Sequence, residues 1–329
     1  MSQLMNARPR HALILSVTAI GLIAAGCSSG NPAPATTVTK TAANGSTTVQ
    51  TQAGSTPAAP SPTATPATPV GMTTLNSDGA EYGVGMPVIV FFTKKPTDAR
   101  AFQEATKTTV DGKAIAADWY FEFSSATKGY PVEAHLRPQA YWKAHSKVHV
   151  GFAPSGTSLG KGLALKTKLT SLDFSIGASN ITTVDNSTHK VTVVSDGREI
   201  GSYPTSLGAS NTRTRRGIKV IMEKGASICM KGPGYNECGV KWTQRLTYDG
   251  EYLHAAPWNT RNIANGVNSS NGCTNLTTPD AKTLYGELRV GDVVAYPNAD
   301  GPKMQLGQGY GDWNVSWGEW QTGGLVSTT

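Results

Sequence analysis

Short runs of alternating hydrophobic and polar residues, separated by turn signals, make up the chain from residue 73 to residue 177. Aromatic and β-branched residues are frequent in these runs, and no long helical period lies between them. Regular short strands of this kind are typical of a β-sandwich domain of immunoglobulin-like size. We predict that Trp119 and Trp142 pack in its core or against the next domain. The predicted strands cover residues 87–92, 118–123, 132–137, 147–152 and 171–176.

The pattern over residues 178–296 is again mainly β, with two hairpin signals and one helix signal. β-rich arms flank the Asp-Gly pairs at 196–197 and 249–250, and such pairs favour tight hairpin turns. The helix is predicted to begin with Thr278 as N-cap and Pro279 at its first position. We therefore predict a second domain that is β-rich and contains one short helix.

The first 27 residues have the pattern of a secretory signal. A short basic region precedes an apolar run at 12–25, which is too short for a membrane span of about 20 residues. The junction IAAGC resembles a bacterial lipobox, in which Cys27 is lipidated and becomes the mature N-terminus; plain export is the alternative. Residues 28–72, rich in Ala, Thr, Pro, Ser and Gly, are predicted to form a disordered, extended tether.

The charge and the histidines narrow the range of partners. Lys and Arg number 29 against 22 Asp and Glu, a net charge of +7 that suits anionic envelope polymers or lipid headgroups, or a soluble surface without a specific partner. No long basic block interleaved with aromatics appears, so we expect no nucleic-acid partner. His145 and His149 have a spacing that suits a metal on a helix, but their surroundings alternate like a strand. We expect no metal and no cofactor.

The cysteines divide into a pair and a single thiol. Export exposes the chain to oxidising conditions, in which cysteines pair. Cys229 and Cys238 bracket a turn-rich loop and are predicted to form a disulfide, which stabilises by roughly 2–3 kcal/mol in the chain-entropy model. Cys273 remains, in the polar stretch SSNGCTNL ahead of the predicted helix, whose N-terminus would favour the thiolate. A leftover thiol of this kind is either reactive or paired between molecules.

A thiol that attacks a carbonyl needs a base and N–H donors for the oxyanion that forms. His254 lies at the end of the second predicted hairpin and ahead of Cys273, so the fold can bring both side chains to one rim. The residues alone leave two interpretations open, a Cys–His dyad and a structural histidine.

The order of His254 and the later segment SNGCTN resembles the signature of the L,D-transpeptidases of the YkuD family, a His followed at this spacing by Ser/Thr-His-Gly-Cys-x-Asn. The segments YDGEYLHAAPW, DAKTLYGELRVGDVV and GDWNVSWGEWQTGG look like those of actinobacterial members. Those proteins carry a lipobox or membrane anchor and immunoglobulin-like domains, so the resemblance covers nearly the whole chain from Thr73. It implies an immunoglobulin-like β-sandwich at 73–177, a β-rich catalytic domain at 178–296, and a C-terminal extension at 297–329 that packs on both.

The resemblance also assigns roles to residues. Cys273 becomes the nucleophile and His254 the general base, whose tautomer is held by the backbone carbonyl of Ala255. Gly272 and Cys273 supply the oxyanion N–H groups. The remaining assignments are loop-stabilising residues and groove residues, namely Ser270, Asn271, Asn275, Tyr235 and Trp258.

The implied reaction joins peptidoglycan stem peptides. Cys273 attacks the amide before the terminal D-Ala of a donor tetrapeptide, and the side-chain amine of a diaminopimelate on another stem takes the acyl group, which gives a 3→3 cross-link. The enzyme is expected at the outer face of the cytoplasmic membrane, held there by its lipid anchor, and carbapenem-type β-lactams are expected to inhibit it.

The sequence departs from the family at the residue before Gly-Cys, where Asn271 replaces a histidine. Asparagine can orient the loop but cannot carry a proton or a positive charge. Two enzyme functions with the same acyl-transfer chemistry therefore compete, a slow transpeptidase and an L,D-carboxypeptidase that uses water as acceptor. A second class of function is a non-catalytic wall-binding lipoprotein, and a third is a Cys endopeptidase that cuts stem peptides. The family's lid region, 222–242 here, is short and contains the cysteine pair.

Overall fold

The computed structural model describes residues 38–41, 47–50, 66–124, 128–232 and 235–329. The chain divides into two compact units, residues 1–63 and 64–329. In the first unit, β1 (Val38–Thr41) pairs with β2 (Thr47–Gln50). This pair falls inside the predicted tether, where local runs of Thr and Val favour strands. Cys27 and the apolar run of the signal lie outside the described residues.

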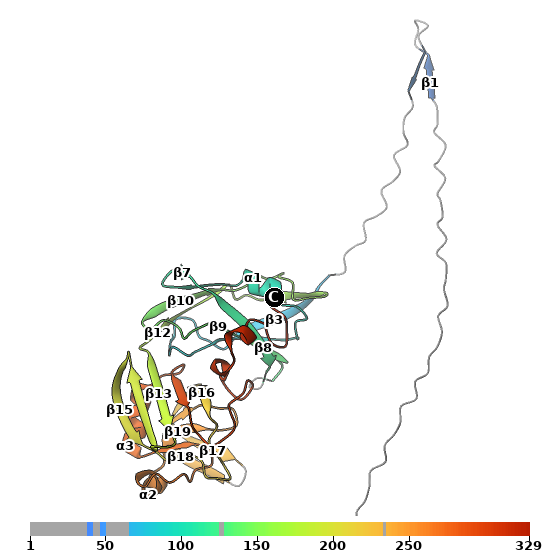
Figure 1. Cartoon of the computed structure of the whole chain (residues 1–329). Helices are drawn as coiled ribbons and strands as arrows, with labels where there is room; N and C mark the ends of the chain where they lie inside the picture. The colour runs from blue at the N-terminus through green and yellow to red at the C-terminus, as the bar shows by residue number, and fades with distance from the viewer. Residues whose placement is uncertain (1–37, 42–46, 51–65, 125–127, 233–234) are drawn as a thin grey trace, which may run out of the picture. The chain divides into compact units, whose positions relative to one another are not determined.

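The first domain of the second unit is a β-sandwich, as predicted (Figure 1). Its two five-stranded sheets have the orders β11-β3-β5-β9-β8 and β4-β12-β10-β6-β7. Trp119 and Trp142 are buried in its core. All five predicted strands are present, as β5, β8, β9, β10 and β12. The elements are β3 (Thr68–Thr74), β4 (Glu81–Tyr82), β5 (Val88–Phe92), α1 (Arg100–Ala105), β6 (Lys107–Val110), β7 (Lys113–Ala114), β8 (Ala117–Phe123), β9 (Val132–Pro138), β10 (Ser146–Gly151), β11 (Leu163–Lys166) and β12 (Ser171–Ile176).

The start of this domain differs from the prediction. β3 begins at Thr68, so the last residues of the predicted tether belong to the sheet, where they pair in parallel with β11. The burial of Val70 and Met72 explains the difference, because these two apolar residues contribute to the sandwich core.

The second domain holds one five-stranded and one four-stranded sheet, with the orders β15-β14-β13-β21-β16 and β17-β18-β19-β20. Its elements are β13 (Asn180–Asp185), β14 (Lys190–Ser195), β15 (Arg198–Pro204), β16 (Gly217–Val220), β17 (Glu223–Gly232), β18 (Tyr235–Arg245), β19 (Tyr252–Ala255), η1 (Pro257–Asn259), α2 (Thr260–Ala264), β20 (Thr274–Leu276), α3 (Thr278–Glu287) and β21 (Val293–Tyr296).

The structure confirms one of the two predicted tight turns and corrects the other turn and the N-cap of the predicted helix. Asp196 and Gly197 form the tight turn between β14 and β15, both with positive φ, as predicted. The pair at 249–250 lies in a longer connection between β18 and β19. The N-cap of α3 is Thr277, whose Oγ1 accepts from the Asp280 backbone N–H, so the predicted cap was one residue late.

Helix α2 was not predicted. It is five residues long and buries a single hydrophobic side chain, that of Ile263. One apolar residue provides no helical period that a sequence pattern can reveal.

The C-terminal segment, drawn red, returns to the immunoglobulin-like domain (Figure 1). It contains η2 (Asp312–Asn314) and α4 (Trp317–Trp320). Trp320 Nε1 donates to Asp118 O on β8 over 2.7 Å, and Gly324 forms a bridge to Phe121. On the other side, Asn314 Oδ1 accepts from the Ile218 N–H of β16 over 2.8 Å. The segment thus contacts both domains.

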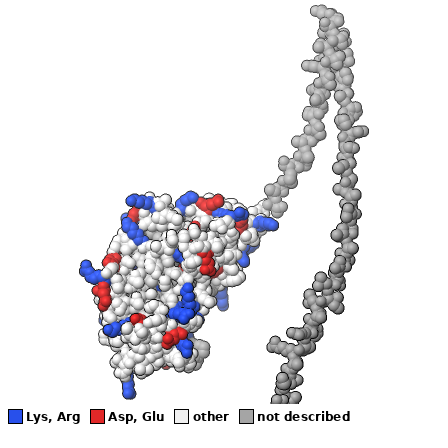
Figure 2. Space-filling model, viewed as in Figure 1, with Lys and Arg blue, Asp and Glu red and all other residues white. Residues whose placement is uncertain are grey.

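Basic and acidic side chains are mixed on the visible face of the folded part. Figure 2 shows Lys and Arg spread over the visible face with Asp and Glu between them, without one broad basic patch. Within the described residues, no helix has the length and apolar character needed to cross a membrane.

Candidate active site

Two parallel strands place the predicted nucleophile and base on one face of a sheet. β19 pairs with β20, and His254 lies directly opposite Asn275 in the register. Side chains two residues apart on a strand point to the same face, so Cys273, just ahead of β20, faces the same side as Asn275 and His254. All three line one cavity of about 360 Å³.

The walls of this cavity come from the β17–β18 hairpin, the segment after β19 and the loop that leads into β20. The hairpin β17–β18 contributes Met230, Glu237 and Val240 on one side. Of the other residues predicted for the site, Trp258, Ser270 and Asn271 also line the cavity, together with Asn259 and Ser269. Tyr235 begins β18, and its side chain lies outside the described part of the structure.

His254 is held as a neutral imidazole. Its Nδ1 lies 2.9 Å from the carbonyl oxygen of Ala255. Because a carbonyl only accepts, Nδ1 carries the hydrogen and Nε2 keeps a free lone pair. Burial lowers the pKa of His254, which favours the neutral form further. The exposed Trp258 stacks on the imidazole with ring centroids 6.0 Å apart. His254 is therefore prepared to accept a proton at Nε2.

Cys273 is buried and protonated. Its Sγ lies 3.5 Å from Gly250 O, toward which the thiol donates. Burial raises the pKa of the thiol to about 12, although the backbone N–H of Tyr252 lowers it. The expectation that a helix N-terminus would favour the thiolate is wrong, because β20 separates Cys273 from α3 and desolvation dominates. The thiol thus needs a base.

A hydrogen-bond network holds the loop that precedes Cys273. Ser270 Oγ donates to Cys273 O over 2.6 Å and accepts from the Gly272 N–H over 3.1 Å. Thr214 Oγ1 donates to Gly272 O over 2.9 Å, and Thr212 Oγ1 donates to Ser270 O over 2.7 Å. Gly272 has φ +107°, a conformation that favours glycine. The Gly272 N–H predicted for the oxyanion is donated to Ser270 in this conformation.

The two asparagines of the motif differ in their surroundings. Asn271 is exposed at the mouth of the cavity, and no hydrogen bond joins its side chain to the described residues. Asn275 is buried, with its backbone N–H donating to Ser206 O and its carbonyl oxygen accepting from Thr205 Oγ1 over 2.8 Å. Its Oδ1 is buried in the cavity wall and has no partner among the described residues.

A buried ion pair behind the nucleophile was not predicted. Lys219 Nζ lies 2.5 Å from Glu251 Oε2 and 3.7 Å from the centre of the Tyr296 ring. The other Glu251 oxygen accepts from the Arg215 backbone N–H. Glu251 raises and Lys219 lowers the pKa of Cys273, so the two charges oppose each other at the thiol. Their signal in the sequence is one Lys on β16 and one Glu in the connection before β19, which no local pattern links.

The predicted disulfide between Cys229 and Cys238 is present. The two residues are register partners on β17 and β18, so the bond joins strands that are already paired. The turn-rich loop predicted between them is a long β-hairpin instead, because its strands continue to Gly232 and Tyr235.

Comparisons with known proteins agree with this arrangement. Residues 179–295 match the L,D-transpeptidase catalytic domain (YkuD), and residues 31–158 match a bacterial Ig domain. The chain is 29% identical to L,D-transpeptidase 2 of Mycobacterium tuberculosis over 255 residues, which are 75% of this chain and 60% of that relative. It is 32% identical to L,D-transpeptidase 5 of M. tuberculosis over 252 residues, 74% and 54% of the two chains. The chain thus spans less than two thirds of either relative.

Solved structures give the same result. An L,D-transpeptidase in complex with imipenem is similar over 68% of this chain and 97% of its own, with a TM-score of 0.55 and 26% identity. An L,D-transpeptidase from M. tuberculosis H37Rv is similar over 69% and 97%, with a TM-score of 0.54 and 27% identity. These matches confirm the resemblance found in the motif around Cys273. The chain carries a YkuD L,D-transpeptidase catalytic domain preceded by a bacterial Ig domain.

Proposed function

We propose that this protein is a peptidoglycan L,D-transpeptidase that forms 3→3 cross-links between stem peptides. The observation that carries the proposal is the placement of Cys273 and His254 on one face of β19 and β20, in one cavity of a YkuD domain. The tautomer of His254 and the protonated thiol supply complementary halves of a nucleophile and base pair.

The first stage forms a thioester. His254 Nε2 takes the proton of the Cys273 thiol while Sγ attacks the carbonyl carbon of the third residue of the donor stem. The C–S bond forms, the C–N bond to the terminal D-Ala breaks, and the imidazolium returns its proton to the leaving amine. The oxyanion of the tetrahedral intermediate needs N–H donors. Rotation of Ser270 Oγ away from Gly272 would release one such N–H at this position.

The second stage transfers the acyl group. The side-chain amine of a diaminopimelate attacks the thioester, a new amide forms, and the C–S bond breaks. His254 takes one proton from the amine, and the thiol is regenerated. With water as acceptor, the same steps give an L,D-carboxypeptidase. The cavity wall is partly apolar, formed by Met230, Val240 and the exposed ring of Trp258. An apolar wall favours transfer to a bound amine over hydrolysis by water, because it limits access of water to the thioester.

The localisation follows from the signal region. We propose that the chain is exported and held by a lipid on Cys27 at the outer face of the cytoplasmic membrane, where peptidoglycan stems are available. Replacement of Cys27 by Ala should release the protein from membranes into the soluble fraction. Retention of the Cys27→Ala variant in membranes would contradict the lipid anchor.

The competing function is a wall-binding lipoprotein without catalysis, which the exposed Asn271 favours. The test is intact-mass spectrometry of residues 64–329, one compact unit, before and after incubation with a carbapenem, beside an assay with disaccharide-tetrapeptide donors. An adduct and a cross-linked dimer with wild type, both lost in Cys273→Ala, are expected. A folded wild type without either product, whose thiol still reacts with an alkylating agent, would leave the wall-binding function.

A further inference from the structure

Four ionisable side chains meet inside the molecule, next to strands β8 and β9 of the immunoglobulin-like domain and outside the cavity that holds Cys273. Glu122 lies on β8, and Glu133 and His135 lie on β9. The fourth, Asp312, comes from the C-terminal segment. Their exposed fractions are 7% for Glu122, 1% for His135 and 0% for the other two. Three carboxylates and one imidazole in a buried place need an explanation, because burial disfavours unpaired charge.

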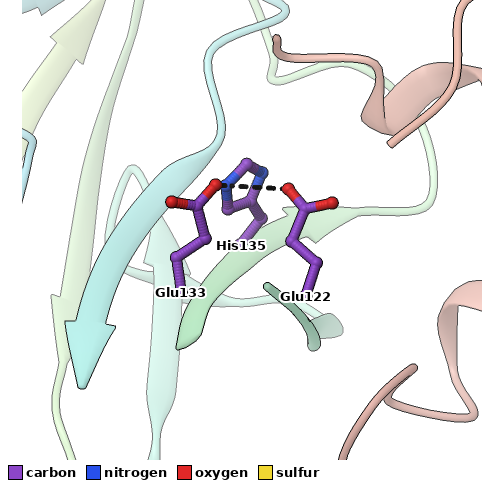
Figure 3. Close-up of side chains that lie close together, drawn as sticks. All are labelled: Glu122, Glu133 and His135. Carbon is purple, nitrogen blue, oxygen red and sulfur yellow. Dashed lines mark hydrogen bonds and ion pairs between the residues drawn. The ribbon is translucent and has the colours of Figure 1, made fainter. Parts of the chain in front are cut away.

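The strand register puts three of them on one face. Glu122 is the direct partner of Glu133 in the antiparallel pair of β8 and β9. His135 follows Glu133 by two positions and so shares its face. Figure 3 shows the three side chains converging, with the imidazole nitrogen facing both carboxylates. Like charges directly opposite each other destabilise a sheet, so a cation between Glu122 and Glu133 would stabilise this pairing.

The distances fit one small ion. His135 Nε2 lies 3.3 Å from Glu133 Oε1 and 3.5 Å from Glu122 Oε1, and the three atoms lie within 4.8 Å of one another. Ligand atoms on a tetrahedron around zinc, with bonds of about 2.0–2.1 Å, lie roughly 3.4 Å apart. Octahedral ligands at the same bond length lie closer, at about 3.0 Å. The separations at the imidazole therefore match a tetrahedral ion.

The outer contacts orient two of the ligands. Asp312 Oδ1 lies 2.7 Å from His135 Nδ1, which donates to it, so Nε2 is the ring nitrogen that faces the carboxylates and could ligate an ion. Ser124 Oγ donates to the second oxygen of Glu133 over 2.9 Å. A carboxylate behind a ligating histidine is the arrangement that protein zinc sites use.

The carboxylate of Glu122 has no hydrogen-bond partner among the described residues, although its Oε1 lies 3.5 Å from His135 Nε2. Both of its oxygens are buried. Glu122 also lines a surface cavity of about 400 Å³ beside Phe123 and Leu306, which provides a path for an ion to enter.

We propose that Glu122 Oε1, Glu133 Oε1 and His135 Nε2 bind one divalent transition-metal ion, of which Zn²⁺ fits the ligand set and spacing best, with water as the fourth ligand. Asp312 orients His135 from behind. Because Asp312 belongs to the C-terminal segment that also bonds to the catalytic domain through Asn314, the ion would stabilise the attachment of that segment to the immunoglobulin-like domain. The predicted role is structural, and the ion takes no part in acyl transfer.

The test uses residues 64–329 carrying Cys273→Ala, so that zinc cannot bind the thiol. The protein is stripped with a chelator, and Zn²⁺, Mg²⁺ or Ca²⁺ is added back during native mass spectrometry and thermal unfolding. We expect one Zn²⁺ per chain and a Tm several degrees higher than that of the stripped protein, roughly 2–8 °C for about 1 kcal/mol in a domain of ordinary size. Mg²⁺ and Ca²⁺ should give no shift.

Glu122→Gln tests the site itself, because it keeps the shape of the side chain and removes the charge. This variant should lose both the bound ion and the Zn²⁺-dependent shift of Tm. The matched control is Asp173→Asn, which removes an acid from an exposed pair with His149 and should keep both. If the carboxyl groups of the cluster are protonated and bind no ion, the stripped protein takes up no Zn²⁺ and its Tm does not change when Zn²⁺ is added. That result, an equal response to Mg²⁺ or Ca²⁺, or an unchanged zinc response in Glu122→Gln would overturn the proposal.

Discussion

At the scale of single residues, the chemistry of the site depends on a thiol that burial keeps protonated and a histidine that burial keeps neutral. The pKa of Cys273 is raised to about 12, and that of His254 is lowered below its usual 6.5. Neither group is activated alone at neutral pH. Under the proposed function, proton transfer from the Cys273 thiol to His254 Nε2 is the step on which nucleophilic attack depends.

The pH dependence of acylation follows from these two directions. His254 accepts a proton only when neutral, so acylation of Cys273 by a carbapenem should be constant at neutral pH and decline as the pH falls through a value below 6.5. A free thiolate mechanism would instead raise the rate about tenfold per pH unit up to the raised pKa of the thiol. Rates from pH 5 to 9, followed by intact mass, distinguish the two, and a continuous rise to pH 9 would contradict a His254 base.

Asn271→His should accelerate acylation. A histidine at the cavity mouth can carry a positive charge near the thiol, which Asn271 cannot. Because residue 271 is exposed, solvent screens this charge, and we expect a modest gain of roughly threefold to tenfold. The same mass-spectrometric rates measure it, with Asn271→Gln as the neutral control. A variant no faster than that control would show that the residue only shapes the loop.

Thr214→Val should weaken the loop before Cys273. The buried Thr214 hydroxyl donates to Gly272 O and accepts from the Gly208 N–H, so its loss leaves two buried backbone groups without partners. We expect a loss of about 1–3 kcal/mol in the free energy of unfolding, measured with urea, and slower acylation. Thr283→Val, at an exposed hydroxyl on α3, is the control and should stay within about 0.5 kcal/mol. Equal effects of both would contradict this role.

At the scale of elements, the long hairpin of β17 and β18 borders the cavity that contains the Cys273 thiol. It forms one wall of the cavity through Met230, Glu237 and Val240. The disulfide joins Cys229 to Cys238 near its tip, and both residues are exposed. A cross-linked tip restricts the motion of the wall, so the disulfide should affect access as well as stability.

The double variant Cys229→Ser/Cys238→Ser tests this hairpin. Removing a cross-link that closes a short loop should lower the free energy of unfolding by roughly 2–3 kcal/mol in the chain-entropy model. Hydrogen exchange should rise in β17 and the facing half of β18, while β19 stays protected. If exchange of the hairpin is unchanged in the double variant, the strand pairing alone holds the wall.

At the scale of the whole molecule, one buried cluster runs through both domains. Val220 and Val293 of the catalytic domain belong to the same core as the sandwich strands and Val326 of the C-terminal segment. Arg137 on β9 packs against the C-terminal segment, with its guanidinium carbon 4.2 Å from the centre of the Trp320 ring and 4.7 Å from that of Trp313. Residues 64–329 should therefore unfold as one cooperative unit.

Arg137→Lys should lower the stability of this unit, although it keeps the charge. A lysine cannot stack its planar group on the rings or donate in the same directions as Arg137, which bonds to Val315 O over 2.9 Å. We expect a loss of roughly 1–3 kcal/mol, measured by denaturant unfolding. Arg100→Lys, in an exposed pair with Asp98, should change little. Separate unfolding transitions for the two domains would contradict the shared core.

The sequence by itself determined what local patterns encode. Alternation placed the sandwich strands, and Asp196-Gly197 marked a tight turn because few other residues adopt its conformation. The order of His254 and the segment SNGCTN resembled the motif of the YkuD family. Only the tertiary structure decided the state of the thiol, since burial is a property of packing. It also brought Lys219 to Glu251, and Asp312 to His135, from distant parts of the chain. Such contacts leave no period in the sequence, because they form only when separate strands and segments pack together.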